Sequence, residues 1–206
     1  LAQPVSEAPS AITVIDRDMI RASGARSVDE LLRWVPGFQV GHRSGFLPLT
    51  TYHGLSDEAP RRMLVRIDGR SSYTPYYVSG IEWHKLTVDI DDIERIEVVR
   101  GSNAAAFGSQ AFLGVVNILT RNPAESPAAR LRVVHGENGV RDRSASVSRR
   151  FGPGALRLSL GRDGDSGVDG LADSWTRDRA DLRFDWQIDT TQRVEVHAGG
   201  TRLDGG

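Results

Sequence analysis

The chain contains no cysteine, and this absence excludes disulfides, thiolate metal sites and thiol catalysis. Long apolar runs are missing too: no stretch approaches the roughly 18–20 consecutive apolar residues that a membrane-spanning helix needs. Charge of one sign is not in excess, because 26 basic and 27 acidic residues give a net charge of -1. Nucleic acid binding, which requires a clustered basic face, is therefore not expected. Residues 1–4 lack the basic start and apolar core of a signal peptide, so we expect a mature or trimmed form.

The first half of the chain mixes helix and strand signals. A helix is expected after Asp16, a residue type that caps helices, through Ser23, with Gly24 as its stop. A second helix is expected over residues 28–35, where apolar residues recur at i, i+3, i+4 and i+7 behind a Ser-x-x-Glu capping box. Asp68-Gly69 is typical of a hairpin turn. Strands are expected at residues 11–15, 63–67, 95–100 and 115–119. This half therefore predicts a small α/β domain with its own core.

From about residue 130 the helical periodicity gives way to alternation with a period of two. The clearest example is residues 180–188, in which apolar residues alternate with charged or polar ones. Further strands are expected at residues 130–135, 144–148, 156–160 and 193–198. Short turns are expected at residues 152–154 and 189–192, and a long polar connection at 163–177.

Both a soluble β-sandwich and an outer-membrane β-barrel fit this alternation. A sandwich would bury the apolar face in a core, whereas a barrel would turn that face to lipid and the charged face to its lumen. Two features favour the barrel: strands near the roughly 9–11 residues needed to cross a membrane, and short turns that alternate with a long connection. Trp186, beside a short turn, lies where an aromatic girdle would be. The expected lumen-facing charges are Arg183, Asp185, Arg193 and Glu195.

Five segments of the first half resemble the plug of TonB-dependent outer-membrane receptors, in the order and at the spacing of that family. They are residues 9–15 (PSAITVI), 27–40 (SVDELLRWVPGFQV), 64–70 (LVRIDGR), 93–101 (IERIEVVRG) and 107–120 (FGSQAFLGVVNILT). The chain departs from the family pattern at His53-Gly54, Ser102 and Phe107, and no TonB box is recognisable before Pro4.

The resemblance implies an α+β plug domain, a small mixed sheet with short helices, over residues 1–124. Antiparallel strands of a transmembrane β-barrel would follow over residues 125–206. We count about five such strands, and an open sheet of five would expose lipid-facing leucines and unpaired edges. The chain is therefore expected to be a fragment of a longer receptor.

The implied function is TonB-dependent active uptake of a scarce, bulky solute across the outer membrane of a Gram-negative bacterium. An iron–siderophore or similar chelate is the leading solute, because it is the most frequent family assignment; haem, cobalamin and an oligosaccharide are the others. The implied partners are TonB, with ExbB and ExbD, on the periplasmic side, together with the ligand and outer-membrane lipid. The alternative is a soluble plug-like binding or signalling module without transport, in which the β half is a small sandwich.

Two sets of side chains are candidates for this function. Aromatic rings on loops offer large, rigid contact surfaces, so ligand contact is expected on the loops 42–51 and 71–84. The candidate ligand residues are Arg43, Phe46, Tyr73, Tyr76, Tyr77 and Trp83. Charges that interleave with a buried strand are candidates for locking the plug to the barrel wall: Glu94, Arg95, Glu97 and Arg100. Packing against the wall and ordinary surface pairs, worth about 0–1 kcal/mol each, are the respective alternatives.

No catalytic site, cofactor site or metal site is expected. The glycines at 101 and 108 lack the Gly-Lys-Ser/Thr and Gly-x-Gly-x-x-Gly patterns of phosphate loops, so they are interpreted as turn residues. Asp89, Asp91 and Asp92 lack a calcium-loop pattern and are interpreted as turn or helix-start caps. The chain is accordingly predicted not to be an enzyme.

Overall fold

The computed structural model describes residues 11–55, 60–73, 80–101, 107–108 and 110–205. The chain divides into two compact units, and they are described separately. The first comprises Leu1–His42, Pro48–Trp83 and Ile90–Thr120, and the second comprises Arg43–Leu47, His84–Asp89 and Arg121–Gly206. Two short pieces from the first half of the sequence therefore belong to the second unit.

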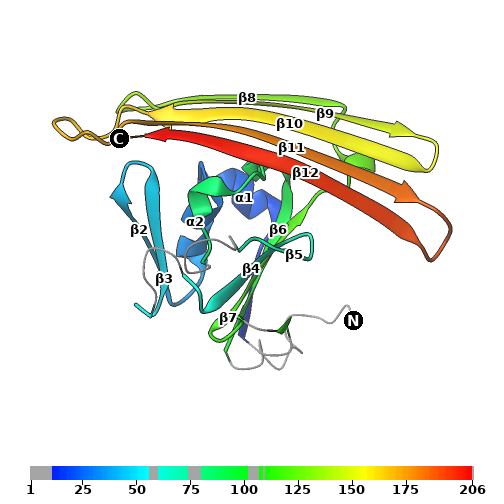
Figure 1. The fold of residues 1–206 in the computed structure, drawn as a ribbon, viewed down its shortest axis with the longest axis horizontal. Helices are drawn as coiled ribbons and strands as arrows, with labels where there is room; N and C mark the ends of the chain where they lie inside the picture. Colours follow the sequence, from blue (N-terminus) through cyan, green and yellow to red (C-terminus); the bar gives the residue numbers. More distant parts are fainter. Residues whose placement is uncertain (1–10, 56–59, 74–79, 102–106, 109, 206) are drawn as a thin grey trace. The chain divides into compact units, whose positions relative to one another are not determined.

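The first unit is built on a mixed five-stranded sheet (Figure 1). Its strand order is β1 (Ala11–Ile15), β6 (Ile93–Arg100), β7 (Gly114–Thr120), β4 (Met63–Ile67) and β5 (Arg70–Ser71). β4 and β7 are parallel, and the other neighbours are antiparallel. The residues of β6 and β7 that face the core are fully buried: Ile96, Val98, Val116 and Ile118. This is the mixed sheet with short helices that the sequence predicts.

The helix starts follow from the capping residues. α1 (Arg17–Ser23) begins where Asp16 accepts a hydrogen bond from the backbone N–H of Met19 at 2.9 Å, and it ends at Gly24 with φ +67°. The second helix is shorter than predicted, because α2 (Val28–Leu31) tightens into the 3-10 turn η2 (Leu32–Trp34).

The predicted capping box forms only in part. Ser27 is the N-cap of α2, but its side chain makes no capping hydrogen bond. The Glu30 carboxylate instead accepts from the N–H of Arg26, at 2.9 Å, one residue further out. The acidic half of the motif thus still satisfies a donor at the helix start.

Residues 42–51, expected as a loop, lie in a hairpin of β2 (Phe38–Ser44) and β3 (Leu47–Tyr52). The sequence hides these strands because Gly41 and Pro48 lower strand propensity. A two-strand ribbon tolerates both, since every strand in it is an edge. The turn expected at Asp68-Gly69 is confirmed. Both residues have positive φ, and the Asp68 carboxylate accepts a hydrogen bond from the N–H of Thr120 at 2.8 Å.

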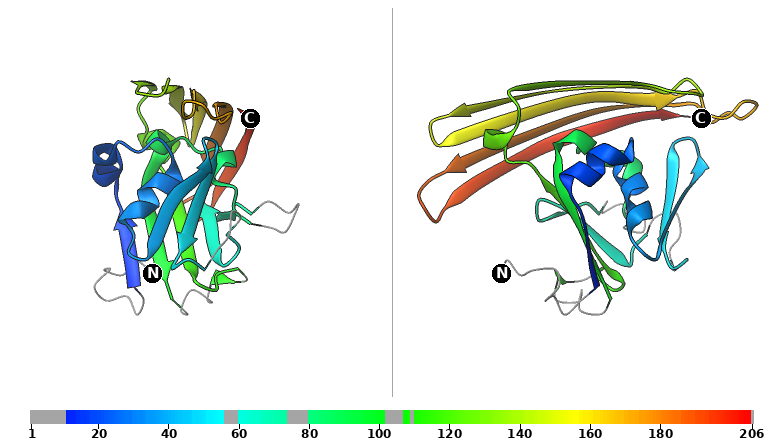
Figure 2. Two further views of the ribbon diagram at one scale, coloured as in Figure 1. Left: turned by 90° about the vertical axis from the view of Figure 1, so that its left-hand side faces the viewer. Right: turned by 180° about the vertical axis from the view of Figure 1, so that it is seen from behind.

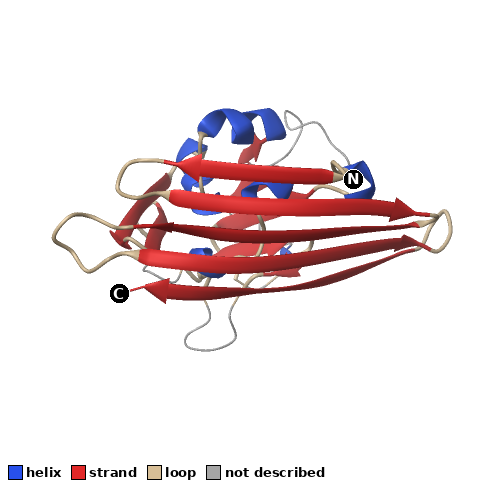
Figure 3. Cartoon of the chain, turned by 90° about the horizontal axis from the view of Figure 1, so that it is seen from above, coloured by secondary structure: helices blue, strands red, loops and turns tan. Residues whose placement is uncertain are grey.

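The second unit contains one antiparallel five-stranded sheet, in the order β12-β11-β10-β9-β8 (Figure 3). The strands are β8 (Ala129–His135), β9 (Arg141–Phe151), β10 (Gly154–Asp165), β11 (Trp175–Gln187) and β12 (Arg193–Gly205). Consecutive strands pair throughout and form a single curved layer (Figure 2). β10 and β11 extend into the expected long connection, which shortens to residues 166–174.

Three-residue 3-10 turns also occur in the described part of the chain. They are η3 (Trp83–Lys85), η4 (Ile90–Asp92) and η6 (Pro123–Glu125), the last started by Asn122, whose side chain accepts from the N–H of Ala124. Within the described ranges, no helix combines the length and apolar character needed to cross a membrane.

The two faces of the second unit's sheet settle the choice between sandwich and barrel. The apolar face is exposed, and the residues at least 37% exposed on it include Leu131, Val147, Leu158, Leu160, Trp186, Val194 and Val196. The charged face is buried instead, with Arg157, Arg183 and Asp185 each at most 5% exposed. A sandwich requires the opposite arrangement, so the sandwich alternative is wrong. A barrel wall requires this one.

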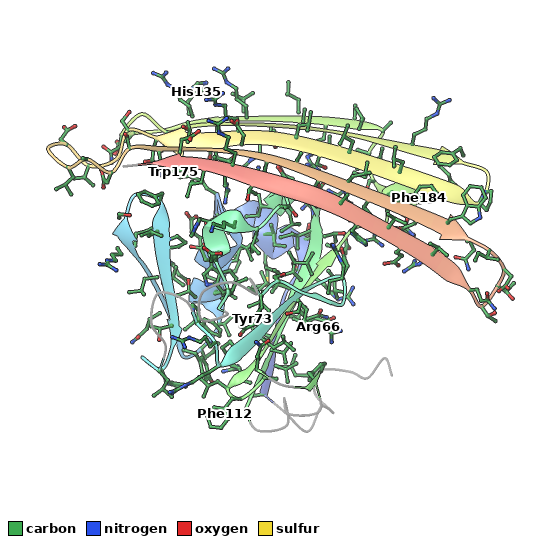
Figure 4. The ribbon with its side chains drawn as sticks, viewed as in Figure 1. Arg66, Tyr73, Phe112, His135, Trp175 and Phe184 are labelled. Atoms are coloured by element: carbon green, nitrogen blue, oxygen red, sulfur yellow. The ribbon has the colours of Figure 1, made fainter. Side chains whose placement is uncertain are left out.

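An aromatic cluster lies on the exposed face beside the short turns. Phe184 (Figure 4) is 6.1 Å from both Phe151 and Trp186, measured between ring centroids. Phe151 and Trp186 themselves are 6.3 Å apart. Trp186 therefore sits in a small aromatic patch at the end of the sheet where an interfacial girdle is expected.

Candidate functional site

The buried face of β11 carries charged side chains at every second position. They are Arg177, Arg179, Asp181, Arg183 and Asp185, and none is more than 9% exposed. Because buried charges are costly unless they are paired and hydrogen-bonded, this face must be held by specific partners.

Asp163 of β10 pairs with two of these arginines. Its Oδ2 atom lies 2.8 Å from Nη2 of Arg177 and 2.5 Å from Nη1 of Arg179. Further along β11, Arg183 forms a two-bond pair with Asp185, with both N–O distances at 2.9 Å. The remaining terminal nitrogens, Nη1 of Arg177 and Nη2 of Arg179, can therefore bond groups outside the sheet.

Segment His84–Asp89 lies on this charged face within the second unit. The carboxylate of Asp89, which is 1% exposed, accepts from Nη2 of Arg179 at 2.7 Å and from Nη2 of Arg130 at 3.3 Å. Asp89 thereby joins arginines from β11 and β8, the two strands on either side of β9 and β10. The interpretation of Asp89 as a turn cap misses this role.

Three weaker bonds hold the rest of the segment. Arg177 donates to the His84 carbonyl at 3.3 Å. The Thr87 hydroxyl donates to Asp181 at 3.0 Å. Thr201 of β12 donates to the carbonyl of Lys85 at 3.3 Å. The segment is therefore bound to β11 and β12 at four of its residues, His84, Lys85, Thr87 and Asp89, in each case by a hydrogen bond or an ion pair.

Two glycines make room for these contacts. A Cβ atom on Gly161 would lie 2.7 Å from Nε of Arg179, and one on Gly199 would lie 3.1 Å from Cβ of Thr87. Neither position has space for a side chain without moving its neighbour. The alternation pattern alone does not reveal such positions, because it records which face a residue occupies and not what lies above it.

The hairpin tip Arg43–Leu47 is the other early piece in the second unit. A Cβ atom on Gly45 would lie 2.2 Å from the carbonyl oxygen of Asp173, so the tip packs closely against the 166–174 connection. Phe46, a predicted ligand residue, is half-buried and lies over Gly205, whose added Cβ would be 2.9 Å from its ring. Arg43, also predicted, is exposed.

The remaining predicted ligand residues do not share one environment. Trp83 is 3% exposed and is thus a core residue of its unit. Tyr73 (Figure 4) is partly buried, and its hydroxyl donates to the carbonyl of Met63. Burial raises the pKa of Tyr73 to about 12. Tyr76 and Tyr77 lie outside the described residues.

The four predicted locking charges lie on β6 in the first unit. Glu94 is exposed at a bulge in the β6–β7 pairing. Arg95 pairs with Glu97 at 2.7 Å along the same strand, and Arg100 donates to the carbonyl of Pro36 and to Thr13, each at 3.2 Å. The partners of Arg95, Glu97 and Arg100 named here belong to the first unit.

Exposed apolar side chains mark a further surface that the sequence reasoning missed. Phe107 is 45% exposed, and Phe112 (Figure 4) is 74% exposed. Both follow the end of β6, and the connection is tied to the start of β4 by a 2.8 Å bond from the N–H of Leu113 to the carbonyl of Arg62. Large exposed rings on a connecting loop are a usual feature of binding surfaces.

Comparison with known proteins decides the family. Residues 4–115 match the family described as TonB-dependent Receptor Plug Domain, more than half of the chain. The chain belongs to the TonB-dependent receptor family. As a TonB-dependent receptor, it is a protein of the Gram-negative outer membrane, and the segment His84–Asp89 lies within its plug region. Among the described residues, no group of three or more His, Cys, Asp and Glu side chains could hold a metal ion.

Two curated relatives of this TonB-dependent receptor carry different functional names. The chain is 28% identical over 170 residues to the vitamin B12 transporter BtuB of Vibrio vulnificus, covering 81% of this chain and 27% of the relative. It is 28% identical over 218 residues to the iron-regulated outer membrane virulence protein of Vibrio cholerae, covering 98% of this chain and 32% of the relative. The chain thus spans about a third of these relatives or less.

Solved structures support the fold. The ferric-catecholate import receptor Fiu from E. coli superimposes with a TM-score of 0.73 at 22% identity, covering 98% of this chain and 28% of that one. The siderophore receptor PirA from Acinetobacter baumannii gives a TM-score of 0.71 at 18% identity, covering 97% and 32%. The names of these similar proteins describe transporters and receptors, not enzymes.

Proposed function

We propose that this chain is the plug and first wall of a receptor that takes up a scarce, bulky solute across the outer membrane by TonB-dependent transport. The observation that carries the proposal is the attachment of plug segment His84–Asp89 to the charged inner face of β11. A plug that closes a wide barrel must be held to the wall in the resting state and must leave it when the solute passes.

The chemistry of this attachment suits both demands. The bonds between the segment and the sheet are ion pairs and hydrogen bonds, and water can replace each of them when the segment moves. An apolar interface of the same size would lose about 25 cal/mol for each Å² that is exposed again to water. The polar interface is specific in geometry and costs less to separate.

We propose that the four charged residues of β6 also help to hold the plug to the wall. Glu94 is exposed, and Arg95 and Glu97 form only a partly exposed pair. Such a pair contributes about 0–1 kcal/mol, so its members are available to wall strands beyond β8–β12. We propose that Asp89 fixes the plug to the first strands and that these charges, with Arg100, fix it elsewhere.

The ligand surface is proposed from the predicted loop residues, with one addition. Arg43 and Phe46 at the hairpin tip and Tyr73, Tyr76 and Tyr77 in the second loop remain the proposed contact residues. Trp83, at 3% exposed, would support the second loop from the core. Phe112 is added because its ring is 74% exposed. Ligand binding would release the wall contacts, and TonB, energised by ExbB, ExbD and the proton gradient, would then pull the plug.

The solute is proposed to be an iron–siderophore or similar chelate. The support is the iron-regulated relative from Vibrio cholerae, which matches 98% of the chain. The relative from Vibrio vulnificus is named as a vitamin B12 transporter, and a corrinoid is therefore the competing solute. Both are bulky chelates that are too large for an open water-filled pore.

Growth of a deletion strain distinguishes these solutes. The strain is complemented with the wild-type receptor and supplied with one iron chelate at a time, or with vitamin B12 where growth requires it. We expect restored growth on at least one ferric chelate, and loss of that growth when TonB is also deleted. Growth restored by vitamin B12 alone would reject the iron assignment, and growth without TonB would reject the transport mechanism.

A further inference from the structure

The exposed face of the second unit's sheet carries a row of arginines that the transport function does not use. Register places Arg143 of β9 opposite Arg162 of β10, Arg162 opposite Asp178 of β11, and Asp178 opposite Arg202 of β12. Four neighbouring strands thus contribute one charged residue each to a single row across the sheet. Arg143 is exposed, and the side chains of Arg162 and Arg202 are 65% and 78% exposed.

The row borders the apolar band of the same face. Two residues further along the strands, the next row contains Ala145, Leu160 and Ala180. The rows beyond it contain Val147, Leu158 and Leu182, and then the aromatic cluster around Phe184. The face therefore changes from apolar to cationic within one step of about 7 Å, which is two residues of strand.

The cationic row lies at the end of the sheet that carries the longest connection, residues 166–174. Residues 136–140 and 166–174 join strands at this end, whereas residues 152–153 and 188–192 join them at the aromatic end. In outer-membrane barrels the longer connections are extracellular and the short turns periplasmic. The arginines are accordingly at the level of the outer leaflet's headgroups, where the apolar band ends.

Acidic neighbours reduce the positive charge of this region but do not cancel it. Asp178 lies 3.6 Å from Arg162, and Asp204 lies 3.2 Å from Arg202. Both pairs are highly exposed, so each contributes little and can open in favour of another anion. Arg141, exposed in the adjoining row on β9, adds a further cation, and His135 (Figure 4) is its cross-strand partner.

We propose that this row, Arg143, Arg162 and Arg202, binds the phosphate groups of outer-leaflet lipid. Guanidinium groups form paired hydrogen bonds with phosphate oxygens, and their apolar stems can lie along the hydrocarbon boundary. Three of them at one height along the barrel match a surface on which phosphates lie in one plane. The partner is a phosphate-bearing lipid headgroup and not a protein, because the same face continues directly into the lipid-facing band.

The test compares variants of the complete receptor that contains this chain, purified in a neutral detergent. The probe is lipid A with both phosphate groups, and its dephosphorylated form is the chemical control. Binding is measured by native mass spectrometry. A cationic residue near an anionic membrane surface contributes about 1 kcal/mol, so replacing each arginine by glutamine is expected to weaken binding about fivefold, and replacing all three about a hundredfold.

Two controls separate lipid binding from unfolding and from charge in general. Arg149 is exposed on β9 and points to the same face, six residues from Arg143 and thus about 20 Å away at the other end of the band. Arg149→Gln should change the affinity less than twofold. Lysine replacements of the three arginines should retain most of the binding, since they keep the charge.

These measurements can reject the lipid-binding proposal independently of the proposed transport function. Equal affinity of the triple glutamine variant and the wild type would overturn it, as would equal binding of dephosphorylated lipid A. Competition by inorganic phosphate at the same concentration as lipid A would also overturn it, because the site would then recognise free phosphate. Solute uptake is measured separately, and its loss or retention does not enter this test.

Discussion

Replacing Asp89 by asparagine should loosen plug segment His84–Asp89 from the inner face of the barrel strands. The change keeps the size of the side chain and removes its charge. Asp89 is 1% exposed and pairs with Arg179 at 2.7 Å and with Arg130 at 3.3 Å. The amide of the Asp89→Asn variant could accept a hydrogen bond from one of these guanidinium groups but could not neutralise either.

The free-energy cost of Asp89→Asn depends on which ion pairs Arg179 and Arg130 keep after the substitution. Breaking a buried ion pair by removing one partner costs about 3–5 kcal/mol. Arg179 keeps its 2.5 Å contact with Asp163, so the lower end of this range applies. About 3 kcal/mol corresponds to an increase of about 150-fold in the population of the open segment.

A thiol introduced next to Asp89 reports this population. The chain has no cysteine of its own, and Val88, at 5% exposed, is buried in the same segment. A Val88→Cys receptor in detergent should react slowly with a water-soluble maleimide, at a rate set by opening of the segment. Adding Asp89→Asn should accelerate the labelling about 150-fold.

A matched control removes a charge elsewhere in the plug. Arg21→Gln removes an exposed charge of α1, so it should change the opening free energy by about 0–1 kcal/mol, or at most fivefold in labelling rate. An acceleration of less than threefold by Asp89→Asn would refute the reasoning, because the buried ion pairs would then not hold the segment.

Three further perturbations test other parts of the molecule. Gly161→Ala should destabilise the sheet by about 1–3 kcal/mol in denaturant unfolding, because the new methyl group would displace Arg179; Gly200→Ala, where an added Cβ meets nothing within 4 Å, should be neutral. Burial raises the pKa of Tyr73 to about 12, so this residue should ionise at higher pH than the other tyrosines in an ultraviolet pH titration. In the unfolded state the pKa of Tyr73 is near its ordinary value of 10.0. The stability that the neutral phenol contributes should therefore be complete below pH 10.0 and should be lost between pH 10.0 and about 12. Trp186→Ala should lower stability in lipid vesicles by about 1–3 kcal/mol and should have less effect on the plug's own unfolding.

Local signals predict the helix ends and the strands of the five-stranded sheet in the first unit, but not the β2–β3 hairpin. Asp16 and Gly24 mark the two ends of α1, and the apolar spacing from Val28 to Val35 marks a face that is buried as expected. These predictions succeed because capping and helix periodicity depend on neighbours within one turn. Ser27 shows the limit, since the helix start is satisfied by Glu30 through the N–H of Arg26 instead.

The strands of the second unit were predicted by position but not by length. Alternation identified all five, yet β10 continues to Asp165 and β11 begins at Trp175, inside a stretch that reads as a polar loop. The polar residues of this stretch belong to the inner, charged face of a barrel strand. Polarity signals a loop in a soluble protein, whereas here the pairing of the two strands decides the boundary.

The attachment of the plug segment could not have been predicted from single residues. Asp89, Arg130 and Arg179 lie far apart in the sequence, and only the strand register brings the two arginines under one carboxylate. A lone acidic residue before a 3-10 turn is typical of a cap, so the local pattern favours the ordinary interpretation. The long-range pairing is a tertiary property that carries no local signature.

The central claim is that the second unit is barrel wall, with its apolar face toward lipid and its charged face toward the lumen. Spin labels at successive positions 180–185 of β11, one per variant in this cysteine-free chain, test it in the membrane-embedded receptor. We expect strict alternation: accessibility to oxygen, which dissolves in lipid, at positions 180, 182 and 184, and protection from it at 181, 183 and 185. Oxygen accessibility at the charged positions, or its absence at the apolar ones, would contradict the assignment of this sheet to the barrel wall.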